Sequence, residues 1–238
     1  MVDGLIAMHL ERYKATGAEL IMGEATFAGV HTLDVHLNAG GMRTLVGERV
    51  FLNLGTQASL PPVPGLAEAA PLTHIELLEL DRLPEHLMVV GGGYVGLEFA
   101  QAYRRFGSKV TLLQQGPQLL AHADPDVATE LTQLLTTEGI EVLVSTALVH
   151  VHGRSGTEVR LGVRSATGET TLIGSDILVA TGRRPNTAGI GLEAVGIDMD
   201  QRGYIKVNDR LQTTAPNVWA IGECAGSPQF THVSFLLR

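Results

Sequence analysis

A glycine-rich run between residues 87 and 98 carries the clearest chemical signal in the sequence. It reads LMVVGGGYVGLE and places Gly91, Gly93 and Gly96 in the spacing G-x-G-x-x-G. The first glycine of such a turn permits a tight bend, the second lets the backbone approach a phosphate, and the third lets a helix lie close to its strand. The first amides of that helix carry partial positive charge. The run therefore predicts a site for the pyrophosphate of a dinucleotide.

The elements expected around the glycines are those that such a site needs. Four apolar residues, 87–90, form a short buried strand before the turn, and residues 109–113 form a second strand after Gly107 ends the helix. The helix between them has apolar residues at helical spacing: Val95, Phe99, Tyr103 and Phe106. This order of strand, turn, helix and strand favours dinucleotide binding over the alternative, a βαβ unit with a glycine-rich turn that binds nothing.

Composition limits the classes of protein to consider. The chain has 238 residues, 45% hydrophobic and 18% charged, which suits one large or two modest globular domains. Its net charge is −8 and no basic run stands out, so neither nucleic acid nor a membrane is an expected partner. The single cysteine, Cys224, excludes an internal disulfide framework. Residues 1–4 lack a signal-peptide pattern, and we expect a cytoplasmic protein.

The first third of the chain predicts a helix, several strands and a linker. An amphipathic helix is expected over residues 3–16, a strand over 19–22, and a hairpin of strands 31–37 and 44–46 around the turn 38–41. An apolar run at 50–54 ends at Gly55 and Thr56, and prolines at 61, 62 and 64 form a linker.

After the glycine unit, the pattern continues as a Rossmann-like domain. Asp124 and Pro125 start a helix whose apolar residues are Val127, Leu131, Leu134 and Leu135. A strand follows at 140–144, and three antiparallel strands at 149–152, 158–163 and 170–173 form a β-meander before a buried strand at 177–180. From Arg183 the chain is loop-rich until a short buried strand that begins at Val218.

Three further stretches stand around the glycine motif in a recognisable order: residues 53–56 (NLGT), 180–186 (ATGRRPN) and 214–223 (TAPNVWAIGE). Together they resemble the flavin-dependent pyridine nucleotide–disulfide oxidoreductases, such as glutathione reductase, dihydrolipoamide dehydrogenase and mercuric reductase. The resemblance implies an α/β fold in which a Rossmann-like NAD(P)-binding domain with a β-meander crossover (84–183) is inserted between two parts of an incomplete, three-layer ββα FAD-binding domain (1–83 and 184–238).

The chain departs from this family in three respects. The amino-terminal GxGxxG for FAD, the CxxxxC redox pair and the carboxyl-terminal dimerisation domain are not in the sequence. We therefore expect a fragment of such an enzyme, and we assign no catalytic residue and no metal ligand in it. The fragment would bind FAD partially or poorly, and the family homodimer is not expected.

The resemblance also implies roles for particular residues. Gly91, Gly93 and Gly96, with Val95 between them, would hold the NAD(P)H pyrophosphate, and Tyr94 would cover the flavin ring. Glu98 would lie near the flavin, and Gly182 and Arg183 near the nicotinamide dinucleotide. The expected contacts to FAD come from Gly55, Thr56, Gly222 and Glu223, where Glu223 replaces the family's aspartate. The alternatives are that Tyr94 only packs at the helix start, Glu98 favours the helix dipole, and Arg183 is a surface charge.

The choice between NAD and NADP stays open. An acid roughly 20 residues past the glycines would bind the ribose diol of NAD, and an arginine would favour the 2′-phosphate of NADP. The sequence has Gln114 and Gln115 there. Glutamine can bond a hydroxyl group and does not repel a phosphate, so these residues favour neither dinucleotide strongly.

In the full-length family, a hydride passes from NAD(P)H to FAD and electrons continue to a disulfide, a metal ion or a quinone. Two alternatives are a non-catalytic NAD(P)-binding module and a defective remnant of such an enzyme.

Two other features of the sequence have simple structural explanations. His150 and His152 have the spacing of a metal pair, but without a third ligand nearby they fit solvated strand residues better. Cys224 fits a buried filler better than a redox group.

Overall fold

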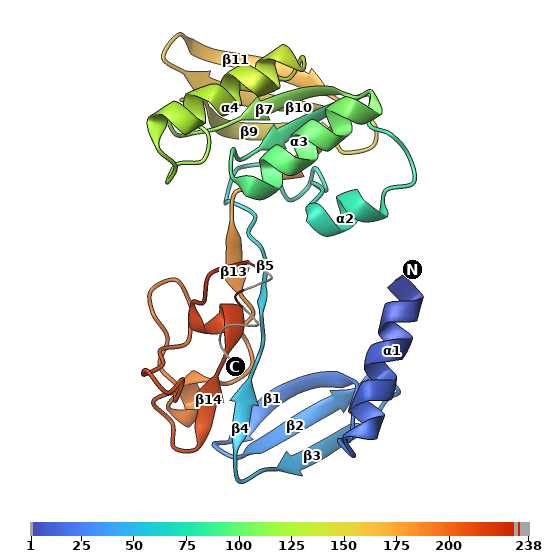
Figure 1. The fold of residues 1–238 in the computed structure, drawn as a ribbon, viewed down its shortest axis with the longest axis vertical. Coiled ribbons are helices and arrows are strands. Elements are labelled where there is room, and N and C mark those ends of the chain that lie inside the picture. Colours follow the sequence, from blue (N-terminus) through green and yellow to red (C-terminus); the bar gives the residue numbers. More distant parts are fainter. Residues whose placement is uncertain (1, 231–232, 234–238) are drawn as a thin grey trace. The chain divides into compact units, whose positions relative to one another are not determined.

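The computed structural model describes residues 2–230 and 233, and the chain divides into two compact units, labelled by element in Figure 1. One unit comprises Gln57–Arg184, and the other comprises Met1–Thr56 with Pro185–Arg238. Each unit has buried clusters of its own. The two units are described in turn.

A four-stranded parallel sheet forms the centre of the 57–184 unit. Its strand order is β12-β6-β7-β8. The strands are β6 (His86–Val90), β7 (Lys109–Leu113), β8 (Glu141–Leu143) and β12 (Asp176–Val179). Two helices connect them, α3 (Tyr94–Phe106) and α4 (Pro125–Thr137). The Rossmann-like arrangement expected from the sequence is confirmed.

A three-stranded antiparallel sheet provides the crossover from β8 to β12. It consists of β9 (Ala147–Arg154), β10 (Glu158–Ser165) and β11 (Gly168–Gly174), in the order β11-β10-β9. This is the β-meander that the sequence predicts, with its strands longer by one or two residues at most ends.

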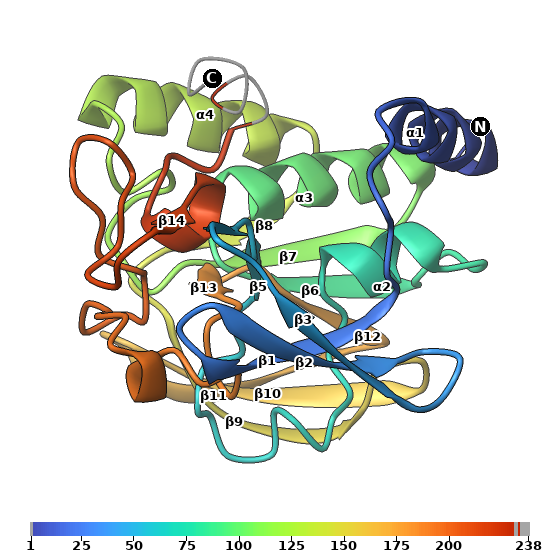
Figure 2. The same ribbon diagram turned by 90° about the horizontal axis from the view of Figure 1, so that it is seen from below.

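The two faces of the parallel sheet are covered by different layers. Leu87 and Val89 of β6 pack in a cluster with residues of α3 and α4, whereas Met88 and Val90 pack in a cluster with residues of β9 and β10. Successive side chains of a strand point to opposite faces, so one continuous apolar strand serves both layers. Figure 2 shows α3 and α4 on one side of the sheet and β9–β11 on the other, so this unit has three layers.

The buried faces of the two helices differ in part from the expected ones. In α3 the buried residues are Gly96, Leu97, Ala100 and Tyr103, while Val95 and Phe106 are 40% and 67% exposed. In α4 Ala128 and Leu135 are buried and Val127 and Leu134 lie outside. A helix buries the stripe that its sheet contacts, and small residues such as Ala100 fill close approaches that larger side chains could not.

The segment between the linker and β6 belongs to this unit. Leu66, Ala69, Leu72 and Leu77 are buried in its two clusters. A short helix that the sequence analysis missed, α2 (His74–Glu79), lies within the segment. The unit therefore begins at Gln57, whereas the sequence places the domain boundary between residues 83 and 84. Two short strands, β5 (Thr56–Ala58) and β13 (Arg183–Pro185), pair where the chain passes between the units.

The other unit contains an antiparallel sheet, a parallel strand pair and loops. The sheet has the order β1-β2-β3, formed by β1 (Gly23–Gly29), β2 (Thr32–Leu37) and β3 (Met42–Val46). The hairpin of β2 and β3 is confirmed, but the strand expected at residues 19–22 is wrong. The chain instead pairs at 23–29, where backbone hydrogen bonds to β2 outweigh the weak strand propensity of two glycines and two alanines.

The core of this unit lies around β4 (Val50–Leu52) and β14 (Val218–Ala220), which pair in parallel. Two short 3-10 helices, η1 (Glu193–Val195) and η2 (Gly222–Ala225), complete its regular structure. The buried residues come from both chain segments and include Leu52, Leu192, Ile197, Val218 and Cys224.

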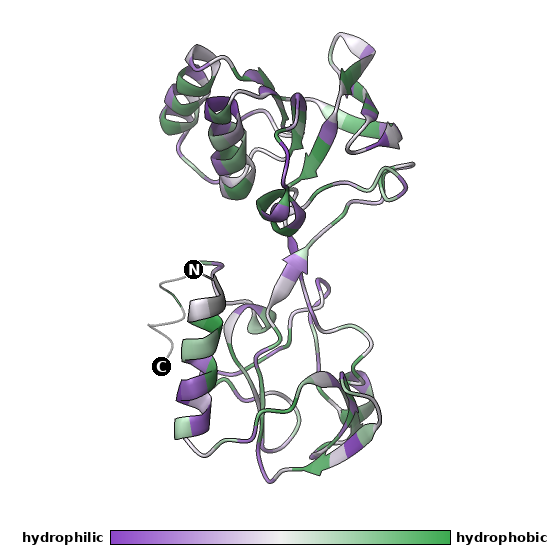
Figure 3. Ribbon diagram, turned by 90° about the vertical axis from the view of Figure 1, so that its right-hand side faces the viewer, coloured by the Kyte–Doolittle hydropathy of each residue, from purple (hydrophilic) through white to green (hydrophobic). Residues whose placement is uncertain are grey.

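Helix α1 (Val2–Ala15) lies where a helix was expected and stops before Gly17, but over residues 4–15 it has no buried apolar face. Its apolar residues are exposed, with Leu5 at 51% and Tyr13 at 54%, and Figure 3 shows both hydrophobic and hydrophilic residues along it. Across residues 2–230 and 233, no helix has the length and apolar character needed to cross a membrane.

Candidate functional site

Two of the three motif glycines are required by the fold itself. Gly91 has φ +115°, and a Cβ there would lie 2.4 Å from the carbonyl oxygen of Ala180. A Cβ on Gly96 would lie 2.0 Å from the carbonyl oxygen of Gly91. Neither position has room for a side chain, so these glycines let β6, α3 and the end of β12 approach one another.

Gly93 is different from both. It has φ −85° and ψ 180°, an extended conformation that any residue adopts, and a Cβ there would meet no atom within 4 Å. The residue is also exposed. Neither the backbone conformation nor internal packing therefore requires a glycine at position 93. Because this residue has no side chain, the space at the start of α3 stays open.

The first turn of α3 faces this open space. Gly93 is the N-cap and provides no side-chain hydrogen bond to the helix. The first backbone bond at the helix start runs from the Leu97 amide to the Gly93 carbonyl, at 3.0 Å. Tyr94 is 60% exposed and Glu98 is exposed. The amide-rich end of the helix dipole thus lies where an anionic group can reach it.

Gln114, at the end of β7, contacts the turn directly. Its side-chain oxygen accepts a hydrogen bond of 2.9 Å from the Gly92 amide, and the residue is half-buried. The spacing of the motif predicts Gln114 near the ribose, and it does not predict this contact with Gly92. Gly92 itself lies close to Gln114 and to the buried Leu119, because a Cβ on Gly92 would be 2.7 Å from a methyl group of Leu119.

Gly182 and Arg183 follow β12, whose neighbour in the sheet is β6. Gly182 has φ +128°, is exposed, and would direct a Cβ into open space. Arg183 is half-buried and donates from Nη1 to Nε2 of His74, at 3.3 Å. The sequence did not predict that His74 would contact Arg183.

A signal for its helix existed in the T-x-x-E pattern of Thr73 and Glu76. These residues form a capping box: the Glu76 carboxylate accepts from the Thr73 amide at 2.8 Å, and Ile75 donates to the Thr73 hydroxyl. The capping box holds the start of α2, and with it His74, in place.

The positions expected at FAD form a separate group in the other unit. The Thr56 hydroxyl donates to the Glu223 carboxylate, so Gly55 and Thr56 after β4 lie beside Gly222 and Glu223 after β14. Gly222 has φ +71°, and a Cβ there would be 3.0 Å from Oδ1 of Asn53. The structure thus brings these four expected residues together.

Cys224 is fully buried behind this group. Its thiol is 3.3 Å from the carbonyl oxygen of Ile221, which agrees with a small buried filler.

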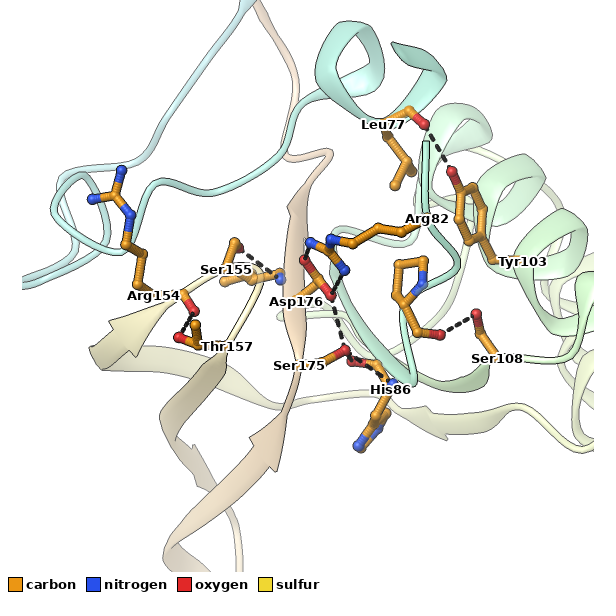
Figure 4. Close-up of polar contacts among 12 residues, drawn as sticks. Leu77, Arg82, His86, Tyr103, Ser108, Arg154, Ser155, Thr157, Ser175 and Asp176 are labelled. Carbon is orange, nitrogen blue, oxygen red and sulfur yellow. Dashed lines mark hydrogen bonds and ion pairs between the residues drawn. The ribbon is translucent and has the colours of Figure 1, made fainter. Parts of the chain in front are cut away.

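An ion pair between Arg82 and the buried carboxylate of Asp176 fixes the opposite end of the parallel sheet. Arg82 contacts both carboxylate oxygens of Asp176, at 2.5 and 2.9 Å, and Ser175 donates to the same carboxylate (Figure 4). Burial alone would raise the pKa of Asp176, but the hydrogen bonds from Arg82 and Ser175 outweigh it and lower that pKa. These charges hold β12 to the segment before β6 and lie at the amino ends of the strands, away from the glycine turn.

The fold and the glycine turn define a Rossmann-type α/β protein whose motif leaves open space at the start of α3. A family model described as pyridine nucleotide-disulphide oxidoreductase matches residues 6–235. The chain belongs to this family.

Curated relatives agree with this assignment. The "probable pyridine nucleotide-disulfide oxidoreductase RclA" of Escherichia coli K12 is 37% identical over 217 residues, which cover 91% of this chain and 48% of the relative. A mercuric reductase of Acidithiobacillus ferrooxidans is 38% identical, covering 90% and 38%. A dihydrolipoamide dehydrogenase of Chaetomium thermophilum is 32% identical, covering 92% and 44%.

Solved structures give the same picture. The Cu(II) complex of the HOCl-induced flavoprotein disulfide reductase RclA from Escherichia coli matches with a TM-score of 0.83 and 35% identity, over 90% of this chain and 48% of that one. The chain thus spans about half the length of the relatives it matches, or less.

Proposed function

We propose that this chain binds NAD(P)(H) at the glycine turn and supplies part of an FAD site, within an oxidoreductase that passes a hydride from NAD(P)H to FAD. The observation that carries the proposal is Gly93. It is the motif glycine that the fold does not need, and its missing side chain leaves open the position where a pyrophosphate would approach the first turn of α3.

The residues of the turn fit this role. Gly91 and Gly96 bring α3 against the sheet, so that the amides of its first turn point at the open space. Gln114 holds the Gly92 amide and fixes the shape of the turn before any ligand arrives. Tyr94 and Glu98 project from the same end of α3, and Arg183 adds a positive charge after β12.

The flavin side of the proposal involves the other unit. Gly55, Thr56, Gly222 and Glu223 would contact FAD, and the Thr56–Glu223 hydrogen bond orients the carboxylate. When bound, the nicotinamide supplies the hydride and the flavin accepts it. In this proposal, the 57–184 unit contains the NAD(P) domain, and residues 1–56 and 185–238 contribute to the FAD domain.

The electron acceptor in this proposal is a disulfide or a metal ion. Relatives are named as mercuric reductases and as disulfide reductases, one of them solved as a Cu(II) complex. Because the sequence contains a single cysteine, a thiol relay would need cysteines outside these 238 residues. We place the activity in the cytoplasm, where thiols stay reduced.

A pair of glycine variants tests the proposal. Gly93→Val should fold with little change in melting temperature but lose NADH and NADPH binding in calorimetric titration, because the valine fills only the ligand's space. Gly96→Ala is the matched control. It should lower the stability of the 57–184 unit by at least about 2 kcal/mol, because its Cβ meets a backbone oxygen.

Unchanged nucleotide binding in folded Gly93→Val would overturn the proposal. Flavin absorbance in the purified parent protein, with electron transfer from NADH to FAD, would favour an oxidoreductase over a non-catalytic binding module.

A further inference from the structure

A histidine pair lies on the β-meander, away from the glycine turn. Val151 of strand β9 is buried at 1% exposure. His150 and His152 flank it and therefore project from the opposite face of the strand. His150 is half-buried and His152 is exposed.

The two imidazole rings lie close to each other. Their centroids are 5.1 Å apart and their planes are inclined by 57°. A metal ion lies about 2.0–2.1 Å from a ligating imidazole nitrogen, and so about 3.2 Å from the centroid of that ring. Two rings that ligate one ion at 90–109° then have centroids roughly 4.5–5.2 Å apart. The observed centroid separation of 5.1 Å falls in this range.

The neighbouring strand leaves room for the His150 ring. Gly162 of β10 is directly opposite His150, and a Cβ on Gly162 would come within 2.1 Å of the His150 ring. The ring therefore occupies space that only a glycine leaves free, which limits its orientations.

A positive charge lies next to the two histidines, and a carboxylate neutralises it. Arg160 is opposite His152 and would repel a cation, but its Nε donates to the carboxylate of Glu158 at 2.8 Å. Both side chains are more than half exposed, so water also screens them.

We propose that His150 and His152 form a two-ligand site for a late first-row divalent metal ion, with Cu²⁺ bound most tightly, then Ni²⁺ and Zn²⁺. Among residues 2–230 and 233, no group of three or more His, Cys, Asp or Glu side chains is placed to hold a metal. Water would therefore complete the coordination shell, and the metal would exchange readily. The sequence spacing favours solvated residues, and the ring separation now favours chelation. This site is independent of the proposed nucleotide binding.

Copper titration of the full chain tests the site, using CuSO₄ without nucleotide. The parent protein should bind one Cu²⁺ equivalent with an electron paramagnetic resonance spectrum of two imidazole nitrogens. His150→Gln and His152→Gln should each weaken this equivalent at least tenfold and leave a one-nitrogen spectrum. The matched control His36→Gln/His122→Gln removes two exposed histidines elsewhere and should keep the parent spectrum.

Circular dichroism of each variant verifies that it is folded. A two-nitrogen spectrum that persists in both single variants would overturn the proposal, as would its loss in the control variant alone. Parent protein that binds no equivalent more tightly than the His150→Gln/His152→Gln double variant would overturn it equally.

Discussion

Among single residues, the three motif glycines have different roles: Gly91 and Gly96 are needed for the fold, and Gly93 is proposed to serve ligand binding. A side chain at position 91 or 96 would collide with backbone oxygens, whereas one at 93 would meet open space. Gln114 adds a contact of a different kind, because its side chain stabilises the turn from the next strand. Gln114 also lies where a side chain is expected to discriminate between NADH and NADPH.

Gln114→Glu is expected to shift the preference toward NADH. A glutamate keeps an acceptor for the Gly92 amide, so the turn is maintained, and its charge repels the 2′-phosphate of NADPH. We expect the ratio of the NADPH to NADH dissociation constants to rise about tenfold, or about 1.4 kcal/mol. Fluorescence titration with both dinucleotides measures the ratio. Gln201→Glu, an equal charge change at an exposed residue of the other unit, should leave it unchanged.

The glycine motif could be predicted from the sequence because its spacing corresponds to a local backbone geometry. The direction of the Gln114 side chain could not be predicted, because its partner is the backbone amide of Gly92, which the folded turn brings near. The same holds for His74, which contacts Arg183 from more than a hundred residues away. Contacts of this kind depend on the assembled sheet, and no local pattern encodes them.

At the scale of elements, strand and helix types were predictable and their faces were less so. β6 was expected as a buried strand, and its alternation between two clusters follows from the pleat. In α3 the exposed Phe106 shows that an apolar residue at helical spacing is not always buried. The helix α2 and strand β1 were missed because short elements carry weak periodic signals.

The ion pair of Arg82 and Asp176 ties two such elements together. Asp176→Asn should lower the free energy of unfolding of the 57–184 unit at pH 7 by about 2–3 kcal/mol, somewhat less than for a wholly buried pair because Arg82 is 40% exposed. The folded-state pKa of Asp176 is below its ordinary value, so its stabilisation is present above the unfolded pKa of about 3.9 and is lost as the pH falls through the folded pKa.

Urea unfolding of parent and variant across this range measures the effect. The two curves should converge at the acid end. A constant difference down to the lowest pH at which the unit folds would show that lost packing, and not the charge, explains the variant.

At the scale of the whole molecule, the chain is built as two units with separate buried clusters. The composition indicated one large or two modest domains, but the prolines expected to form a linker at residues 61–65 lie inside the 57–184 unit. The assignment of residues 57–83 was not predicted, because the leucines that anchor this segment to the 57–184 unit are spread through a stretch rich in loops.

Two units with separate cores should unfold in two steps. Differential scanning calorimetry is expected to show two transitions, and NADH should raise only the one that Gly96→Ala lowers. Saturation at a hundredfold excess over the dissociation constant should stabilise that unit by about 2.7 kcal/mol. A single transition that shifts as a whole would show that the units unfold together.

The most direct test of the account is the amide spectrum of the glycine turn. In a ¹H–¹⁵N correlation spectrum of the labelled chain, NADH should shift the amide signals of Gly93, Val95 and Gly96 more than those of α4, and these shifts should vanish in Gly93→Val. Amide signals at the start of α3 that stay unmoved at saturating NADH, while others shift, would contradict the claim that this turn holds the pyrophosphate.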